Sequence, residues 1–341
     1  MSESQNHLPL GKLNPKFLSE LLMKYTTIDE TVVIGPKVGI DATVIDQGNF
    51  YLIAKTDPIT FVTENIGYYA VNVNANDIAC MGGIPRWFLA TILLPEACAT
   101  REVVDKIFSQ INNACENLDI LFCGGHTEVT FGINRPIVIG QMLGIVDKDS
   151  LISSKNVTPG DDILLTRGIA IEATSIIARE KSEQIAEIYS EELVDKCKNF
   201  IYNPGISVLN DSRLVMQVGG VHAMHDPTEG GLAMGLHELA NAAGFGMKVF
   251  ENEIPILPES KLLCDQFGID PMGAIASGAL LVVVDPHYTQ KIIDDFRQNQ
   301  ILIKNIGKIM EVEYGVKLVG NESEIDMPEF YQDEITKLFQ E

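Results

Sequence analysis

The segment Asn72–Arg86, NVNANDIACMGGIPR, places a carboxylate on the apolar face of an expected helix. Apolar residues recur at helical spacing and form one stripe, made of Ile66, Ala70, Val73, Cys80 and Met81. The pair Gly82-Gly83, followed by Pro85, predicts the end of this helix. Asp77 falls on the stripe, and a carboxylate that faces a packed core costs roughly several kcal/mol unless it is paired.

Asp77 therefore needs a partner, which can be a cation, a basic side chain or backbone donors. Asn72 and Asn76 lie one turn apart on an adjoining face of the same helix. Several polar residues near the buried side of a helix are typical of a ligand site. The alternative is a buried Asp that a neighbouring turn satisfies, and the pattern alone favours neither interpretation.

Composition restricts the kind of protein. A chain of 341 residues predicts two domains, because single cores stop growing near 250–300 residues, roughly. We find no apolar run of the ~20 residues that span a bilayer and no signal peptide, so we expect a cytoplasmic protein. A net charge of -22 argues against nucleic-acid and anionic-membrane partners. An acid-rich protein that binds an anionic nucleotide usually does so through a divalent metal.

The first half of the chain is expected to contain an N-terminal arm over residues 1–35, followed by mixed strands and helices. Lys12, in the arm, is either a solvated side chain or a phosphate contact. Asp41 lies inside the first expected strand, and Asp57 ends the second ahead of Pro58. The expected elements are a helix over 15–23, strands over 39–45 and 50–55, a strand over 87–94, a helix over 101–118, and strands over 120–122 and 135–146.

The polar segment 147–162 predicts a domain boundary, after which the alternation restarts. We expect strands over 163–166 and 277–285 with two more in 302–319, and helices over 169–179, 191–198, 208–218, 232–243 and 327–341. Gly230 and Gly231 precede one of these helices, which predicts an anion site at its N-terminus. The alternative is a surface helix that Thr228 caps. The class is α/β or α+β, without strict Rossmann alternation.

Three acids, Asp41, Asp57 and Asp77, lie at element ends or on the helix stripe. Oxygen ligands from separate elements suit magnesium held with substrate phosphates, although each acid taken alone is more often a turn or cap residue. The sequence contains no GxxxxGK[ST], GxGxxG, GxSxG or HExxH motif. A nucleotide enzyme with this sequence is therefore neither a P-loop nor a Rossmann protein.

Six segments, in order, resemble the motifs of the AIR synthase (PurM) superfamily. They are GIDATV (39–44), KTDP (55–58), NANDIACMG (74–82), GGHT (124–127), GDD (160–162) and DPTEGGL (226–232). The last motif and the NANDIACMG segment look most like the hydrogenase maturation factor HypE and the AIR synthase-related proteins. The resemblance covers about residues 35 to 285.

This resemblance implies a PurM-like architecture of two domains. We expect an ATP-binding, dimerising domain over residues 36–150, which forms a homodimer through its strands, and a second α/β domain over residues 151–341. ATP and magnesium would bind between the domains. By position, Asp41, Asp57 and Asp77 would hold the metal. The residues expected to bind the cofactor are these three with Asn76, Gly124, Gly125, His126, Thr127, Asp226, Thr228, Gly230 and Gly231.

Two positions depart from the family pattern. An acid commonly follows the paired glycines, and this chain has His126, with Glu128 two residues further on. True HypE ends in a cysteine, whereas the last cysteine here is Cys264, so we expect no carbamoyl transfer to its own tail. The implied function is an enzyme that uses ATP and magnesium to activate an oxygen of an unknown acceptor. A small-molecule kinase of the thiamine-monophosphate kinase type and a non-catalytic nucleotide-binding dimer are the alternatives.

Overall fold

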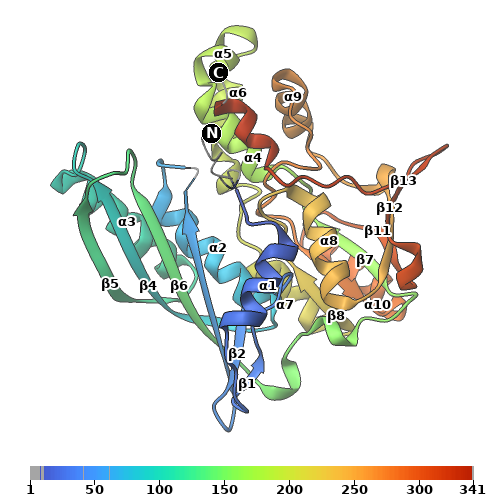
Figure 1. Cartoon of the computed structure of the whole chain (residues 1–341). Helices are drawn as coiled ribbons and strands as arrows, with labels where there is room; N and C mark the ends of the chain where they lie inside the picture. Colours follow the sequence, from blue (N-terminus) through green and yellow to red (C-terminus); the bar gives the residue numbers. More distant parts are fainter. Residues whose placement is uncertain (1–7, 9–10, 41, 61, 340–341) are drawn as a thin grey trace, which may run out of the picture.

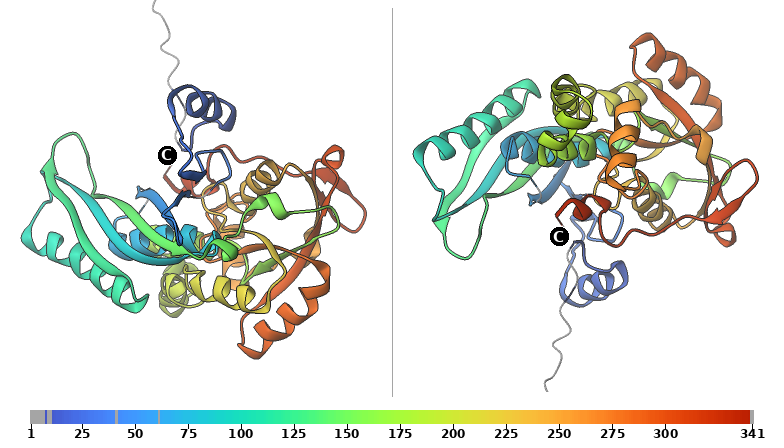
Figure 2. Two further views of the ribbon diagram at one scale, coloured as in Figure 1. Left: turned by 90° about the horizontal axis from the view of Figure 1, so that it is seen from below. Right: turned by 90° about the horizontal axis from the view of Figure 1, so that it is seen from above.

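The computed structural model describes residues 8, 11–40, 42–60 and 62–339, which form two lobes side by side (Figure 1). The first lobe carries a six-stranded sheet in the order β1-β2-β3-β6-β4-β5, and the second a seven-stranded sheet in the order β13-β12-β9-β11-β7-β10-β8. Each sheet has helices packed against it, which confirms the α/β class (Figure 2).

The first sheet is antiparallel except for the parallel pair β4 and β5. Its strands are β1 (Val32–Ile34), β2 (Thr43–Asp46), β3 (Tyr51–Ile59), β4 (Ile84–Pro95), β5 (Leu121–Thr130) and β6 (Ile137–Val146). Helices α2 (Ile66–Cys80) and α3 (Arg101–Asn117) cover one face of this sheet. Along β4 and β6, buried residues alternate with half-buried apolar ones. Among the described residues, no helix packs on that second face (Figure 2).

The second sheet is mostly antiparallel, with β12 parallel to β9. Its strands are β7 (Asp162–Thr166), β8 (Val221–His225), β9 (Gly246–Phe250), β10 (Leu281–Val284), β11 (Ile303–Met310), β12 (Val316–Val319) and β13 (Glu324–Asp326). Its helices are α4 (Ile171–Glu180), α5 (Ser182–Ile188), α6 (Glu191–Lys198), α7 (Leu209–Val218), α8 (Gly231–Ala243), α9 (Pro258–Phe267) and α10 (Pro286–Gln298).

Helix α2 lies at the centre of the molecule and contacts both lobes. It packs on β3, β6 and α3 of the first lobe and on α7 and β8 of the second. Fourteen of its fifteen residues are buried, so the prediction of a single apolar stripe was wrong, although the predicted helix is confirmed. The apolar core of the first lobe continues through α2 into α4 and α6 of the second.

Four predicted elements differ from the observed ones. Strand β3 continues through Asp57 and Pro58 to Ile59, because only β6 pairs with it there and Pro58 needs no second partner. Strand β5 runs straight through the paired glycines. The expected closing helix is only a short 3-10 helix, Glu334–Phe339. The end of the expected arm, residues 1–35, already belongs to the first sheet, because β1 pairs with β2. The arm also contains α1 (Pro15–Tyr25).

In the part of the chain that the structure describes, no helix combines the length and the apolar character needed to cross a membrane.

Candidate active site

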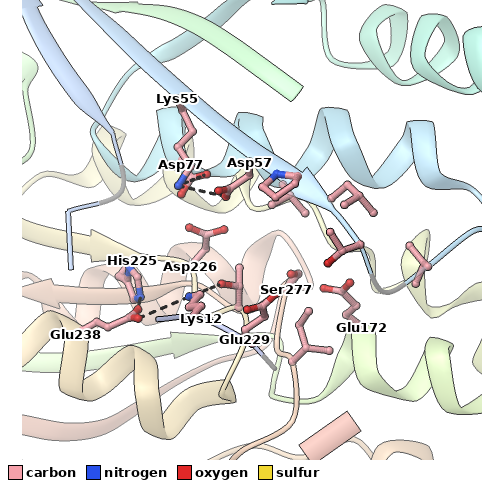
Figure 3. A pocket seen from close by; sticks show the side chains of 18 of the residues that line it. Lys12, Lys55, Asp57, Asp77, Glu172, His225, Asp226, Glu229, Glu238 and Ser277 are labelled. Atoms are coloured by element: carbon pink, nitrogen blue, oxygen red, sulfur yellow. Dashed lines mark hydrogen bonds and ion pairs between the residues drawn. The ribbon is translucent and has the colours of Figure 1, made fainter. Parts of the chain in front are cut away.

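A cavity of about 530 Å³ lies between the two lobes, beside α2 (Figure 3). Strand β3 and α2 contribute its first wall, and the N-terminal arm contributes Gly11 and Lys12. The turn before α8, the start of α4, α8 itself and the loops before β6 and β10 contribute further residues. Charged groups dominate the lining that the structure describes. The acids are Asp57, Asp77, Glu172, Asp226, Glu229 and Glu238, and the bases are Lys12, Lys55 and Arg135.

Asp57 and Asp77 share one basic partner, the ammonium group of Lys55. Lys55 Nζ lies 3.2 Å from Asp57 Oδ2 and 3.3 Å from Asp77 Oδ2. Lys55 and Asp57 are two residues apart on β3, so their side chains lie on the same face of the strand. This face is turned toward α2, which carries Asp77. The sequence left a cation, a basic side chain or backbone donors open as partners of the buried Asp77, and the structure provides a basic side chain.

Asp226 completes a group of three carboxylates at this end of the cavity. It is 2% exposed, and Cys80 Sγ, one turn after Asp77 on α2, lies 3.5 Å from its Oδ1. Figure 3 shows the Asp226 carboxylate pointing toward those of Asp57 and Asp77. Carboxylate oxygens are the donors that magnesium prefers.

The donor chemistry of this group therefore fits magnesium, although the side chains are not yet arranged around one. Within the described ranges, no three His, Cys, Asp or Glu side chains form a group that could hold a metal ion. Lys55 supplies the positive charge between Asp57 and Asp77 instead. A metal ion bound by these acids has to displace the Lys55 ammonium from them. Asp41, the third predicted ligand, lies outside the described residues.

The opposite end of the cavity holds a second charged cluster made of Lys12, His225, Glu229 and Glu238. Lys12 Nζ lies 3.6 Å from Glu238 Oε1 and 3.4 Å from Thr228 Oγ1, and His225 Nε2 lies 3.2 Å from Glu238 Oε2. Burial alone would raise the pKa of Glu238, but His225 and Lys12 lower it to about 2. Burial raises the pKa of Glu229, and Lys12 opposes that change. Glu238 is thus an anion that holds both Lys12 and His225.

Glu172, in the first turn of α4, is the most perturbed acid of the cavity. It is 4% exposed, and its Oε2 has no hydrogen-bond partner. Burial raises the pKa of Glu172 to about 8, with Ser277 opposing the shift and Asp333, Glu229 and Asp226 adding to it. Glu172 is therefore mostly protonated at neutral pH. A buried acid with such a pKa is a candidate functional residue.

The raised pKa of Glu172 predicts how stability depends on pH. Because the folded protein holds this proton more tightly than the unfolded chain, the stabilisation is complete below about pH 4.5 and is lost as the pH rises through 8. We expect Glu172→Gln to have a higher melting temperature than the wild type at about pH 9 and a similar one at about pH 5. Glu180→Gln, at the exposed end of α4, should follow the wild type at both pH values. Equal pH profiles for Glu172→Gln and the wild type would contradict the assignment.

The predicted anion site at the N-terminus of α8 already holds an internal carboxylate. Asp333 Oδ2 accepts a 2.7 Å hydrogen bond from the Gly230 amide, and Gly231 donates to the Thr228 carbonyl. The other oxygen of Asp333 accepts from Ile275 and Ile335. The prediction of free amides at Gly230 and Gly231 was wrong, because the C-terminal segment folds back onto them. Thr228 is not the cap, since Gly230 occupies that position without a side-chain bond.

The segment Gly124 to Thr127 does not reach the cavity within this chain. It lies in the exposed edge strand β5, which β6 and β4 separate from β3. A Cβ at Gly125 would lie 1.9 Å from the Ala90 carbonyl, so close strand pairing explains this glycine. His126 Nε2 lies 3.0 Å from Glu128 Oε2, with both side chains exposed.

Asn76 is also outside the cavity lining, because the backbone of the second lobe uses its amide. Its Nδ2 donates to the Ile206 carbonyl at 2.9 Å, and its Oδ1 accepts from Val208 N at 2.9 Å. Both atoms are thereby committed to joining the lobes. The predicted cofactor-binding residue Asn76 therefore bonds the backbone of the second lobe, while Lys55 contacts Asp77.

The cavity also contains functional candidates that were not among the predicted site residues. They are Lys55, Glu172, His225, Glu229, Glu238, Arg135 and Ser277. One signal was available for Glu172, which is the single acid in the apolar run from Ile169 to Ala178. An acid within such a run must be buried or must interrupt the apolar face.

The fold and the site together define a class, namely α/β proteins with two sheet-based lobes and a carboxylate-rich cavity at their junction. The chain belongs to the AIR synthase-related family. The model of the N-terminal domain of AIR synthase related proteins matches residues 39–146, and that of the C-terminal domain matches residues 158–319. The resemblance inferred from the six motifs is therefore confirmed.

Two relatives match this chain over most of its length. A Methanocaldococcus jannaschii protein assigned by name to hydrogenase expression or formation is 27% identical over 312 residues, which cover 88% of each chain. Carbamoyl dehydratase HypE of Escherichia coli K12 is 26% identical over 269 residues, which cover 77% of this chain and 76% of that one.

Solved structures share the fold across nearly the whole chain. HypE in complex with ATP superposes with a TM-score of 0.69 at 20% identity, covering 92% of this chain and 91% of the other. The thiamine-monophosphate kinase homologue AaThiL, complexed with AMPPCP and TMP, gives a TM-score of 0.69 at 17% identity, covering 93% and 98%.

Proposed function

We propose that this chain binds ATP with magnesium in the cavity between its lobes and uses the nucleotide to activate an oxygen of an acceptor. The observation that carries this proposal is the group of Asp57, Asp77 and Asp226, whose carboxylates come from β3, α2 and the turn before α8 and face the same end of the cavity. Hard oxygen donors of this kind suit magnesium held together with phosphates. The ATP complex of a related fold supports the nucleotide.

The charges of the cavity favour a metal-bound ligand over a free polyanion. Five carboxylates and the mostly protonated Glu172 face three basic side chains in the described lining, so a triphosphate alone would be repelled. Asp57, Asp77 and Asp226 would hold the magnesium, which would supply positive charge next to the phosphates. Lys55, which lines the cavity beside these acids, would add its ammonium charge there. Lys12 and Arg135 supply further positive charge to the phosphates.

Calorimetric titration tests the nucleotide proposal directly. ATP is titrated into the protein with magnesium and, separately, with excess EDTA, and we expect binding only with the metal. Equal ATP binding in EDTA would refute the role given to the three carboxylates.

The fate of ATP separates three functions that share this site. ADP with free phosphate in the presence of an acceptor indicates activation followed by displacement, which is the function proposed here. ADP with a phosphorylated acceptor indicates a kinase of the thiamine-monophosphate kinase type. Binding without turnover across a metabolite panel indicates a nucleotide-binding partner protein. Phosphorus NMR of the reaction mixture distinguishes these results.

We further propose a homodimer through the first sheet. Strand β5 is a ten-residue edge with Leu121 61% exposed and Val129 58% exposed, and Phe131 beyond it is 82% exposed. The sheet face opposite α2 carries half-buried apolar residues on β4 and β6, such as Leu89 and Leu143. Long apolar edges normally have a partner strand or a cover. A second copy of the sheet would cover both the edge and the face.

The dimer leads to a prediction for Val129→Lys. We expect the wild type to have twice the chain mass in light scattering at micromolar concentration and Val129→Lys to have the monomer mass, because charges on an edge strand oppose strand pairing. Leu262→Lys, an exposed apolar position on α9 of the second lobe, is the matched control and should stay dimeric. A monomeric wild type would refute the interface.

A further inference from the structure

One corner of the cavity has a chemical character that nucleotide and metal do not account for. There the Glu172 carboxyl group and the Ser277 hydroxyl are both buried and act on each other by hydrogen bonding, which leaves Glu172 Oε2 without a further partner. Glu172 comes from the start of α4 and Ser277 from the loop before β10, and both line the cavity (Figure 3). A ligand that donates hydrogen bonds here would supply the partner that the buried carboxyl oxygen lacks.

The charged side chains that act on Glu172 in this corner are all acidic. Asp226 and Glu229 from the turn before α8, and Asp333 from the C-terminal segment, are the charged groups that act most strongly on Glu172. The described lysines of the cavity are engaged elsewhere, since Lys12 pairs with Glu238 and Lys55 with Asp57 and Asp77. Apolar side chains complete the lining, namely Ile59, Val62, Val73 and Ile275.

These features match one kind of ligand. A primary ammonium group donates three hydrogen bonds and carries the positive charge that the corner lacks. A short aliphatic chain would pack against the apolar wall. A carboxylate or phosphate would instead meet three acids, and a neutral amide would leave their charge uncompensated.

We propose that Glu172 and Ser277 form the acceptor subsite and that the acceptor carries a primary amine on a short aliphatic chain. This inference rests on the proposed function, because it names the second substrate of the same cavity. Binding of the cation converts Glu172 to its carboxylate, so a proton leaves the protein as the amine enters. Asp226, Glu229 and Asp333 also act electrostatically on Glu172, and Tyr69 on α2 lies close enough to Glu172 for the two groups to interact.

The test uses n-propylamine as the probe at neutral pH and constant ionic strength, without nucleotide. Propionamide and propionate are the neutral and anionic counterparts, and tetramethylammonium is a cation without N–H donors. We expect propylamine alone to raise the melting temperature. Calorimetry in buffers of different ionisation enthalpy should show proton release. Stabilisation by propionamide or tetramethylammonium equal to that by propylamine would overturn the proposal.

Two variants connect the effect to this corner. Glu172→Gln should weaken propylamine binding about tenfold or more and abolish proton release, as expected when a charge-assisted hydrogen bond is lost. Glu180→Gln, on the exposed end of the same helix, should bind as the wild type does. Unchanged amine binding by Glu172→Gln would refute the subsite. Titration of ATP with magnesium, run separately, tests the nucleotide function, so failure of one proposal can be distinguished from failure of the other.

Discussion

Asp77→Asn should reduce the affinity for ATP in the presence of magnesium by about 100-fold, a loss of about 2.8 kcal/mol of binding free energy. The substitution removes a carboxylate that we assign to the metal and leaves the Lys55 ammonium paired with Asp57. Asn keeps the shape of the side chain but is a much weaker magnesium ligand than a carboxylate. Calorimetric titration with and without magnesium measures the effect.

The same variant also tests the structural role of Asp77. Because Lys55 pairs with it in a buried setting, we expect Asp77→Asn to lower the free energy of unfolding by about 1–3 kcal/mol while keeping the fold. Asp105→Asn, on the exposed side of α3, is the control and should change neither quantity. Normal magnesium-dependent affinity together with reduced stability would identify Asp77 as the structural partner of Lys55 only.

The largest effect on stability is expected for Asp211→Ala. Asp211 is fully buried on α7 and holds Arg167 through two hydrogen bonds, of 2.9 Å to Nε and 2.7 Å to Nη2. Arg167 also donates to the Pro204 and Gly205 carbonyls. Removing one partner of a buried ion pair leaves the other charge uncompensated, so we expect a loss of about 3–5 kcal/mol. Urea unfolding at equilibrium measures it.

An exposed ion pair in the same lobe provides the comparison. Asp294 pairs with Arg297 at 2.9 Å on α10, with both side chains largely in solvent. Asp294→Ala should cost less than about 1 kcal/mol, because solvent screens such pairs. Similar losses for Asp211→Ala and Asp294→Ala would show that burial of the Arg167 pair does not determine its contribution.

Elements that local pattern determines were predicted well. A double glycine and a proline directly after α2 marked the end of this helix. Helix α6 matches the predicted 191–198 helix, because its own residues carry the helical pattern. The strand at the paired glycines was missed because β5 has no buried face and Gly125 is required by the neighbouring β4. No pattern within residues 121–130 could report that contact.

The candidate site was harder to predict because its partners are far apart in sequence. Asp57 and Asp77 were identified from their motifs, whereas Lys55 was overlooked although it is two residues from Asp57. Asp333 reaches Gly230 across 103 positions and fills the helix end that was expected to bind an anion. Such a contact depends on how the tail folds back, which periodicity does not encode.

The position of α2 has a consequence for how the protein unfolds. Helix α2 is part of both lobes, because Asn76 bonds the backbone of the second lobe and the apolar core continues through the helix. Neither lobe therefore retains its packing when the other unfolds. Elements that share one core exchange their amide hydrogens through a common opening event. Amides of β3 in one lobe and of β8 in the other should therefore exchange with the same free energy of opening, and ligand entry should proceed without hinge motion between the lobes.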